Sequence, residues 1–235
     1  MDVQAGAEVV ESFSALGVVA FTTGRAAGSF GTASDEPVRD VMGRWSALRE
    51  LVGGPSARLA TAHQVHGTTV VVHEGGWRGW LRGEAADGHL APARGTAMAV
   101  TIADCVPVFL AHPSGATAAL HSGWRGTAGR ITERAIERFR ELGLAPRDLR
   151  LHCGPAICGR CYEVSPDVFA ELTGRRVDAP TVVDLRLLIA DHARAAGIRE
   201  ISLSPACTRC DNDRFFSHRA GDAGRQLGVV FAPAT

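Results

Sequence analysis

Soft metal ligands occur in three separate segments of the chain. His63 and His66 stand in HQVHG, Cys105 stands in TIADCVPV, and His121 stands in HSGWRG. One thiolate and two imidazoles can bind a catalytic zinc ion and leave its fourth position open for water or substrate. Because these residues are far apart along the chain, no short metal-binding motif applies. The residue types therefore predict a dispersed metal site that only the fold can assemble.

His63 and His66 compete for one place in this site. Residues three apart share a face in a helix, whereas in an extended segment they point to opposite sides. Gly67 permits a sharp turn and a β-branched stretch follows it, so we expect His66, at the mouth of that turn, to be the ligand. His63 is then expected to support the ligands or to face the substrate. The alternative is that both are ordinary polar loop residues.

Cys105 follows a carboxylate, Asp104, within otherwise apolar sequence. A free cysteine in such a place can be simple core packing. The neighbouring Asp104 favours chemistry, because it could hydrogen-bond a metal-bound histidine or accept a proton in the reaction. Capping of a turn is the structural alternative for Asp104. A different catalytic scheme makes Cys105 a nucleophile with His121 as its base.

The segment after His121 is suited to an anion. Two glycines let the backbone approach a ligand closely, and the start of a following helix offers free N–H groups. Arg125 adds a guanidinium that fits phosphate or carboxylate. Arg214 and Arg219, in RFFSHR near the C-terminus, are further candidates for an anionic substrate, although the two phenylalanines between them could equally be core residues on alternate faces.

Two CxxC pairs, Cys158/Cys161 and Cys207/Cys210, raise a second metal-binding hypothesis. Four cysteines can hold a structural zinc ion. The 45 residues between the pairs exceed the usual separation in a zinc ribbon. Unpaired, reduced thiols are therefore the favoured interpretation of these four residues.

Short apolar runs and periodic segments indicate the elements that position these residues. His121 is expected at the end of a strand, and Thr127 is expected to cap the helix that follows. We interpret the stretch from Gly75 to Arg94 as a long surface loop. The strands are predicted over 68–73, 98–102, 106–111, 116–120, 149–153, 201–203 and 229–231, and the helices over 127–142, 165–172 and 184–196, the first and last ended by Gly143 and Gly197.

Length and charge limit the classes of function. The chain has 235 residues, with 25 basic and 25 acidic side chains. This size suits one domain over 1–235. The balanced charge gives no field that would attract nucleic acid or an anionic membrane. The start carries no basic region of the kind found in signal peptides, so we expect a cytoplasmic protein, monomeric or a small homo-oligomer, with reduced cysteines.

Taken together, HQVHG, TIADCVPV, HSGWRGTAG, GPAICGRCYEV and CT followed by RFFSHR resemble the bacterial laccase-domain family. Its members are also described as polyphenol oxidase-like or peptidoglycan editing factor-like proteins, and as purine nucleoside phosphorylases with adenosine deaminase activity. The likeness extends from about Phe21 to Phe231. Carried over by position, the metal ligands of the family fall on His66, Cys105 and His121.

The resemblance implies an α+β domain of mixed sheets flanked by helices, related to a toxin domain with a Cys–His catalytic pair. It also implies zinc, with copper as the alternative metal. The implied reactions are phosphorolysis of adenosine, inosine, guanosine or methylthioadenosine, and deamination of adenosine by a water whose pKa the metal lowers. On this basis Cys105, His121 and Asp104 are the candidate catalytic residues. Purine nucleosides and phosphate are the expected partners, bound by Arg125, His63, Arg214 and Arg219.

The chain also departs from the family pattern. The stretch from Thr23 to Ser29 only approximates a glycine-rich turn of the family, which weakens a substrate role for Arg25 or Ser29. Two other functions stay open from the sequence. One is a thiol hydrolase that edits peptidoglycan precursors through Cys105 and His121. The other is a copper-dependent phenol oxidase, although one cluster of two histidines and a cysteine cannot supply the roughly ten histidines that multicopper electron transfer requires.

Overall fold

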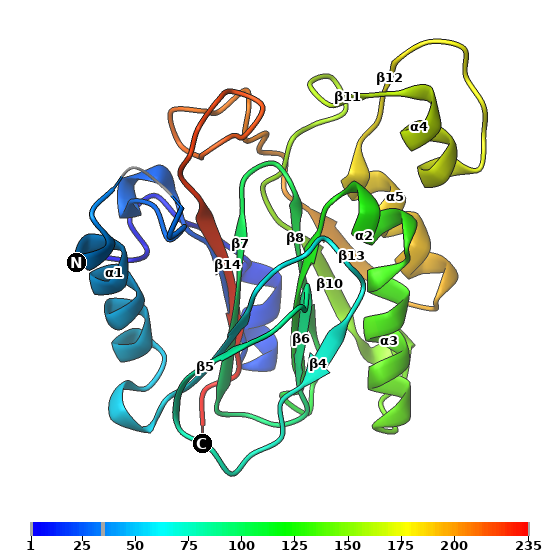
Figure 1. Ribbon diagram of the computed structural model, residues 1–235. Coiled ribbons are helices and arrows are strands. Elements are labelled where there is room, and N and C mark those ends of the chain that lie inside the picture. The colour runs from blue at the N-terminus through cyan, green and yellow to red at the C-terminus, as the bar shows by residue number, and fades with distance from the viewer. Residues whose placement is uncertain (1, 34–35, 235) are drawn as a thin grey trace.

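Two six-stranded mixed sheets face each other in the computed structural model, which describes residues 2–33 and 36–234 (Figure 1). The first sheet has the strand order β1-β2-β14-β7-β3-β5. Its strands are β1 (Glu8–Val9), β2 (Val19–Thr22), β14 (Gln226–Phe231), β7 (Thr96–Ile102), β3 (Arg58–Ala62) and β5 (Gly79–Gly83).

The second sheet has the order β13-β10-β8-β9-β6-β4, and a two-stranded ribbon lies beside it. The strands of this sheet are β13 (Glu200–Leu203), β10 (Arg150–Cys153), β8 (Val106–Ala111), β9 (Thr117–Ser122), β6 (Gly88–Ala91) and β4 (Val70–Val72), and those of the ribbon are β11 (Glu163–Val164) and β12 (Thr181–Val182).

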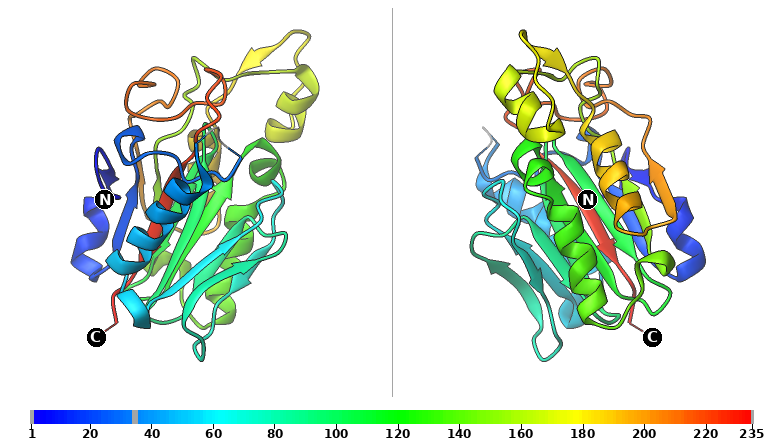
Figure 2. Two further views of the ribbon diagram at one scale, coloured as in Figure 1. Left: turned by 60° about the vertical axis from the view of Figure 1, so that its left-hand side comes forward. Right: turned by 90° about the vertical axis from the view of Figure 1, so that its right-hand side faces the viewer.

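Helices cover the outer faces of both sheets. The long helix α1 lies against the first sheet, whereas α3 and α5 lie against the second (Figures 1 and 2). The helices are α1 (Val38–Leu51), α2 (Trp124–Ala128), α3 (Ile131–Glu141), α4 (Pro166–Thr173) and α5 (Leu185–Ala195), and the short 3₁₀ helices are Glu11–Leu16, Arg25–Ala27, Gly54–Ser56 and Pro146–Asp148.

Side-chain alternation along the strands produces this layered core. In β7, Met98 and Val100 pack between the two sheets with Phe109 of β8, whereas Ala97 and Ala99 face α1 on the other side. Both faces of the central strands are therefore buried, and such strands are expected to read as continuous apolar runs. The sequence of β8, VPVFLA, is buried at every position.

Strand direction gathers several loops at one end of the two sheets. β5, β3 and β7 are neighbours and run parallel, so all three end on the same side. After each of them the chain crosses to the second sheet, through residues 84–87, 63–69 and 103–105 respectively. β9 runs antiparallel to β6 and β8 and therefore finishes at that same end.

Most elements expected from the sequence are confirmed. The run over 106–111 is β8 without change, and the other predicted strands lie within one to three residues of those observed. Ser165 caps α4 by accepting a hydrogen bond from the Val168 N–H at 3.4 Å. Asp184 caps α5 by accepting one from the Arg186 N–H at 3.0 Å. The mixed α+β fold with flanking helices is confirmed as well.

Two local predictions are wrong. The stretch from Gly75 to Arg94 is not one surface loop, because it contains β5 and the fully buried β6. Thr127 is not a helix cap, because it lies inside α2 and its hydroxyl donates to the Gly123 carbonyl at 2.9 Å. The next helix, α3, starts instead after Arg130, whose backbone is left-handed. No helix within the described residues has the length and apolarity needed to cross a bilayer.

Candidate metal centre and active site

The gathered loops bring His66, Cys105 and His121 together. His66 lies in the β3–β4 crossing, Cys105 in the β7–β8 crossing and His121 near the end of β9. One ligand atom from each lies within 4.8 Å of the others. The two imidazole rings meet edge to face, with their centroids 4.7 Å apart. His121 is buried, Cys105 is half-buried and His66 is exposed, so the cluster opens to solvent on the His66 side.

A fourth residue, Asp87 in the β5–β6 crossing, supports this cluster from behind. One oxygen of its fully buried carboxylate accepts hydrogen bonds from His121 Nδ1 at 2.8 Å and from the His66 N–H at 2.9 Å. The other oxygen accepts from the N–H groups of Gly67 at 2.7 Å and Val65 at 3.1 Å. Because Nδ1 of His121 is bound to the carboxylate, its Nε2 is the atom left for a metal.

Backbone strain is concentrated at the same place. Four described residues other than glycine have a positive φ, and two of them are His66 (58°) and Asp104 (79°). The sharp turn in HQVHG is thus made by His66 itself rather than by Gly67, which corrects the sequence interpretation. A non-glycine residue held in this conformation costs about 1 kcal/mol or more, and such residues cluster at functional sites.

Gly123 leaves room for the cluster. A Cβ atom at this position would lie 2.9 Å from Cys105 Sγ and 3.2 Å from His66 Cδ2. Both distances are shorter than ordinary van der Waals contact. Any side chain at Gly123 would therefore collide with Cys105 and His66, two of the three candidate ligands.

Cys105, His121 and Asp87 shift one another's pKa values. Burial opposes ionisation of Cys105, but the charge of His121 and hydrogen bonds from His121 and His66 lower the pKa of its thiol to about 6. Burial also opposes the charging of His121, yet Cys105 and Asp87 raise the pKa of this imidazole to about 9. The pKa of Asp87 falls below its usual value because hydrogen bonds, chiefly from His121, outweigh its burial. A thiolate paired with an imidazolium is ready to release a proton when a cation binds.

We expect metal-stripped protein to be alkylated at Cys105 with a pH midpoint near 6, because only the thiolate reacts and it persists above the lowered pKa of about 6. The rate should fall as the pH drops below that value. Peptide mass spectrometry after timed iodoacetamide treatment would follow Cys105 separately from the other cysteines. Cys153 is the internal control, because burial raises the pKa of its thiol and keeps it unreactive. A midpoint near the ordinary thiol value of about 8.5 would contradict the thiolate pairing.

Asp104 precedes Cys105 but does not make the hydrogen bond to a histidine of the cluster that the sequence suggests. Its carboxylate accepts hydrogen bonds from the Thr208 hydroxyl at 2.6 Å and from the Arg219 N–H at 2.7 Å. Among the hydrogen bonds of the described residues, the carboxylate that bonds a histidine of the cluster is Asp87 rather than Asp104. Asp104 thus joins the Cys105 turn to the loop before β14.

Two of the three predicted arginines lie near the cluster. Burial and the negative charges of Cys105 and Asp104 raise the pKa of the Tyr162 phenol to about 12. The charges of Arg219 and Arg125 also act on this phenol, in the opposite direction. The guanidinium of Arg219 lies 5.3 Å from the centre of the Tyr162 ring. Arg125 is exposed in the short helix α2.

The remaining predicted arginine has a different neighbourhood. The guanidinium of Arg214 lies 5.0 Å from the centre of the Phe215 ring. Phe215 and Phe216 are both buried, which agrees with the core alternative for these aromatic residues.

Arg25 donates to Asp222 at 2.6 Å, and Ser29 accepts from the Arg225 N–H at 3.1 Å. Both are therefore engaged in bonds within the protein.

His63 lines a cavity of about 470 Å³ on the α1 side of the first sheet. This volume lies within the range of small-molecule sites, about 300–1,000 Å³. The walls include Phe30 and the stacked rings of Trp45 and Trp80, whose centroids are 4.7 Å apart. Gln64 also lines the cavity, and it binds the Thr101 backbone at 2.7 Å and 2.8 Å. None of the three candidate ligands lines this cavity. His63 and Gln64, which do line it, stand three and two residues before His66 in the sequence.

The comparisons with known proteins agree on one family. The model of the family described as multi-copper polyphenol oxidoreductase laccase matches residues 23–233. The chain belongs to this family. Among curated relatives, purine nucleoside phosphorylase ORF3 of Streptomyces griseus is 34% identical over 209 residues, which cover 86% of this chain and 85% of the relative. The purine nucleoside phosphorylase of Deinococcus radiodurans is 33% identical over 213 residues, which cover 85% and 80% of the two chains.

Solved structures of relatives share the whole fold. YlmD from Geobacillus stearothermophilus superposes with a TM-score of 0.87 at 27% identity, over 96% of this chain and 94% of that one. The Bacillus licheniformis protein YfiH gives a TM-score of 0.84 at 23% identity, over 95% of each chain. The resemblance to the laccase-domain family inferred from five sequence segments is thereby confirmed.

Sequence reasoning missed two residues that the structure places at the cluster. Asp87 was assigned to a surface loop, although the apolar residues that follow it in GHLA signal a buried strand beginning at its side. Tyr162 stands between Cys161 and β11 in CYEV, and its chain position gives no sign that it approaches Cys105. Only the three-dimensional arrangement of the strands shows that Asp87 and Tyr162 lie near Cys105 and His121.

Proposed function

We propose that this protein is a metal-dependent purine nucleoside phosphorylase, with deamination of adenosine as a second reaction. The observation that carries the proposal is the open cluster of His66, Cys105 and His121, held from behind by Asp87. The names of the curated relatives support the choice of substrate. Purine nucleosides and inorganic phosphate are the proposed partners.

The donor set fits zinc. One sulfur and two imidazole nitrogens match zinc's preferred ligands, and the exposure of His66 leaves one side of the cluster accessible. His66, Cys105 and His121 would hold the ion, and a zinc ion bound there would supply a Lewis acid at the reacting centre. The hydrogen bond from His121 Nδ1 to Asp87 fits the same assignment, because such carboxylate–histidine pairs orient metal ligands.

The cations beside the cluster are our candidates for binding phosphate. Arg125 and Arg219 carry guanidinium groups whose charges both act on Tyr162, which in turn feels Cys105. Arginine is suited to bind phosphate oxygens in pairs. In phosphorolysis a phosphate oxygen forms a bond to C1′ of the ribose while the bond from C1′ to the purine nitrogen breaks. We assign to Arg125 and Arg219 the orientation of the phosphate, and to Asp104 the placement of Arg219 through its N–H.

The aromatic cavity is our candidate for the purine. Its volume and its tryptophan and phenylalanine walls suit a planar base. His63 and Gln64, which line this cavity, stand in the segment that also carries His66. A nucleoside with its base near His63 would have its ribose directed along this segment. The guanidinium of Arg214 packs on the Phe215 ring, so Arg214 would have to leave this ring to reach a substrate.

A product assay tests the function directly. We expect purified, zinc-loaded protein to convert adenosine and phosphate to adenine and ribose 1-phosphate, and to convert part of the adenosine to inosine without phosphate. Chromatography of the nucleosides and bases would separate the two reactions. Inosine, guanosine and methylthioadenosine should be tested in parallel. Failure to release a base from any of the four, at full metal occupancy, would refute the phosphorylase.

One observation favours a second candidate, a thiol hydrolase. Cys105, His121 and Asp87 form the order of thiol, imidazole and carboxylate that activates a nucleophilic cysteine. Covalent trapping of Cys105 by an activated ester or amide substrate in the zinc-loaded protein would support it. A copper-dependent phenol oxidase has less support, because the described residues hold one further candidate metal group and it consists of four cysteines.

A further inference from the structure

The two CxxC pairs, which the sequence left as separate thiols, meet in the structure. The sulfur atoms of Cys158, Cys161, Cys207 and Cys210 all lie within 4.8 Å of one another. None is in a disulfide, and Cys161 Sγ lies 3.5 Å from Cys210 Sγ. This group is separate from the cluster of His66, Cys105 and His121.

The separation of the four sulfurs is that of a metal tetrad. Zinc–sulfur bonds of about 2.3 Å at tetrahedral angles place the sulfurs about 3.8 Å apart. A disulfide requires the two sulfurs at about 2.05 Å. The observed separations of 3.5 Å to at most 4.8 Å bracket the first value and lie well beyond the second.

Backbone N–H groups surround two of these sulfurs. Cys207 Sγ accepts from the N–H of Cys158 at 3.2 Å and from that of Cys210 at 3.5 Å. Cys158 Sγ accepts from the N–H groups of Arg160 and Cys161. Donors directed at sulfur stabilise thiolates, and they accompany metal ligands as outer partners.

A buried arginine, paired with the Asp184 carboxylate at 2.9 Å, lies beside the four sulfurs. Arg186 is 6% exposed, and its charge interacts with Cys158 and Cys207. Its guanidinium also donates to the carbonyls of Ser204 and Ala206, both at 2.8 Å. Arg186 thus fixes the segment that leads into Cys207.

The long spacing between the two pairs follows from topology. Each pair comes after one of two neighbouring parallel strands, β10 and β13. Parallel neighbours require a long crossover, and here the chain between the pairs forms β11, α4, β12, α5 and then β13. A separation unsuited to a zinc ribbon is therefore the one that this fold demands.

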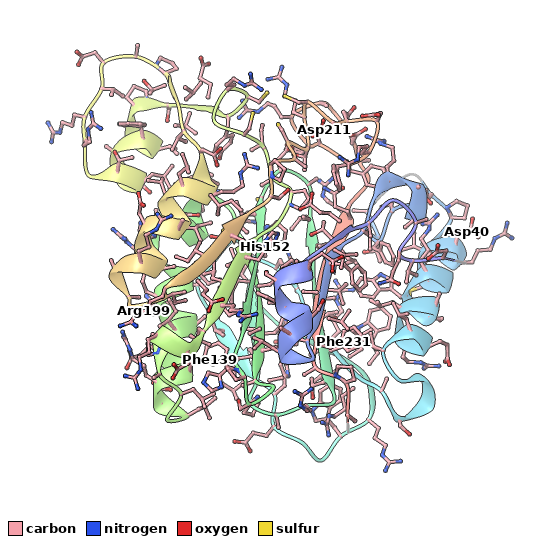
Figure 3. The ribbon with its side chains drawn as sticks, turned by 180° about the vertical axis from the view of Figure 1, so that it is seen from behind. Asp40, Phe139, His152, Arg199, Asp211 and Phe231 are labelled. Carbon is pink, nitrogen blue, oxygen red and sulfur yellow. The ribbon has the colours of Figure 1, made fainter. Side chains whose placement is uncertain are left out.

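We propose that Cys158, Cys161, Cys207 and Cys210 bind a structural zinc ion that clamps the loop after β10 to the loop after β13. The clamp adjoins the candidate active site. Ile157, next to Cys158, donates its N–H to the Asp104 carbonyl at 3.1 Å, and Thr208, next to Cys207, donates to the Asp104 carboxylate at 2.6 Å. The ion would fix the backbone on which Asp104 and its neighbour Cys105 rest. These loops lie at the end of the sheets where Asp211 is labelled in Figure 3.

Metal analysis of separate variants tests the clamp independently of the enzyme. In a Cys105→Ala protein, which lacks a ligand of the other cluster, we expect about one equivalent of zinc to remain bound per chain. Cobalt exchanged into this protein should give the intense visible absorption of a tetrahedral tetrathiolate. Adding Cys161→Ser and Cys210→Ser should remove both signals, whereas adding Cys153→Ala, a cysteine outside both groups, should leave them.

Unaltered protein keeps the test valid if the variants fold poorly. Its zinc content should be about two equivalents per chain when both sites are filled. The four thiols should react with a thiol reagent only as zinc is released. The clamp is refuted if freshly purified protein shows all four as freely reactive thiols or as disulfides, or if cobalt in the Cys105→Ala protein has no thiolate absorption. Neither result depends on whether nucleosides are cleaved.

Discussion

Replacement of Cys105 with alanine is expected to reduce kcat/KM for phosphorolysis by at least about 1,000-fold. Cys105 supplies the only sulfur of the His66, Cys105 and His121 cluster, and two imidazoles alone hold a divalent cation weakly. A metal acting as a Lewis acid contributes several kcal/mol to transition-state stabilisation, and each tenfold in rate corresponds to about 1.4 kcal/mol. Steady-state kinetics with inosine and phosphate would measure the loss, and elemental analysis should show one zinc equivalent fewer.

Cys153→Ala is the matched control for this substitution. Cys153 is fully buried in β10 and belongs to neither metal group. Its replacement should lower stability slightly through lost packing while leaving zinc content and kinetics close to those of the parent. If Cys105→Ala kept both its zinc and its activity, the cluster would not be the catalytic centre.

The sequence predicts the same three candidate ligands that the structure brings together, because their local contexts are distinct. His66, Cys105 and His121 each stand where an apolar run meets a turn, and this context separates them from most of the nine histidines and six cysteines of the chain. The sequence could not show why they meet. That depends on β5, β3 and β7 being parallel neighbours, and pairing between strands leaves almost no local signal.

The residues that the sequence did not reveal were also hidden by strand pairing. Asp87 was hidden because the stretch around it is rich in glycine and arginine, and its burial arises only when β6 is inserted between β4 and β9. The four cysteines were interpreted as separate thiols because their spacing was compared with that of a compact ribbon. A parallel pair of strands joined through two helices brings the same residues together. Sequence distance is informative only once the connection between elements is known.

Both metal groups depend on the same end of the molecule. The chain reaches this end after β3, β5, β7, β9, β10 and β13, and each arrival contributes a ligand or a residue that positions one. Asp104 lies where the two groups meet, since it bonds Thr208 beside one and precedes Cys105 in the other. Asp104 has a left-handed φ of 79° and accepts hydrogen bonds from Ile157, Thr208 and Arg219, the first two of which adjoin the cysteine pairs. We therefore infer that strain at the Cys105 turn is supported by the cysteine clamp.

Replacement of Asp87 with asparagine is expected to weaken zinc binding at the cluster by about 100-fold, the upper end of the range for partners of metal-binding histidines. An asparagine amide facing His121 Nδ1 can donate to it, which would move the ring proton to Nε2 and remove the lone pair that the metal needs. Zinc competition with a chelating dye would measure the affinity. The conservative change alters no carbon packing, so the effect reports on charge and proton position.

The same substitution should also lower the free energy of unfolding of the metal-free protein by about 3 kcal/mol, because a fully buried carboxylate that accepts from three backbone N–H groups and His121 would lose two acceptor positions. Urea denaturation would measure this change. Asp178→Asn, at an exposed position, is the matched control and should shift stability by no more than about 0.5 kcal/mol. A protein in which Asp87→Asn left zinc affinity unchanged would show that the carboxylate only stabilises the fold. A loss of zinc affinity measured where the variant is fully folded would instead show that Asp87 acts on the metal through the orientation and the proton of His121.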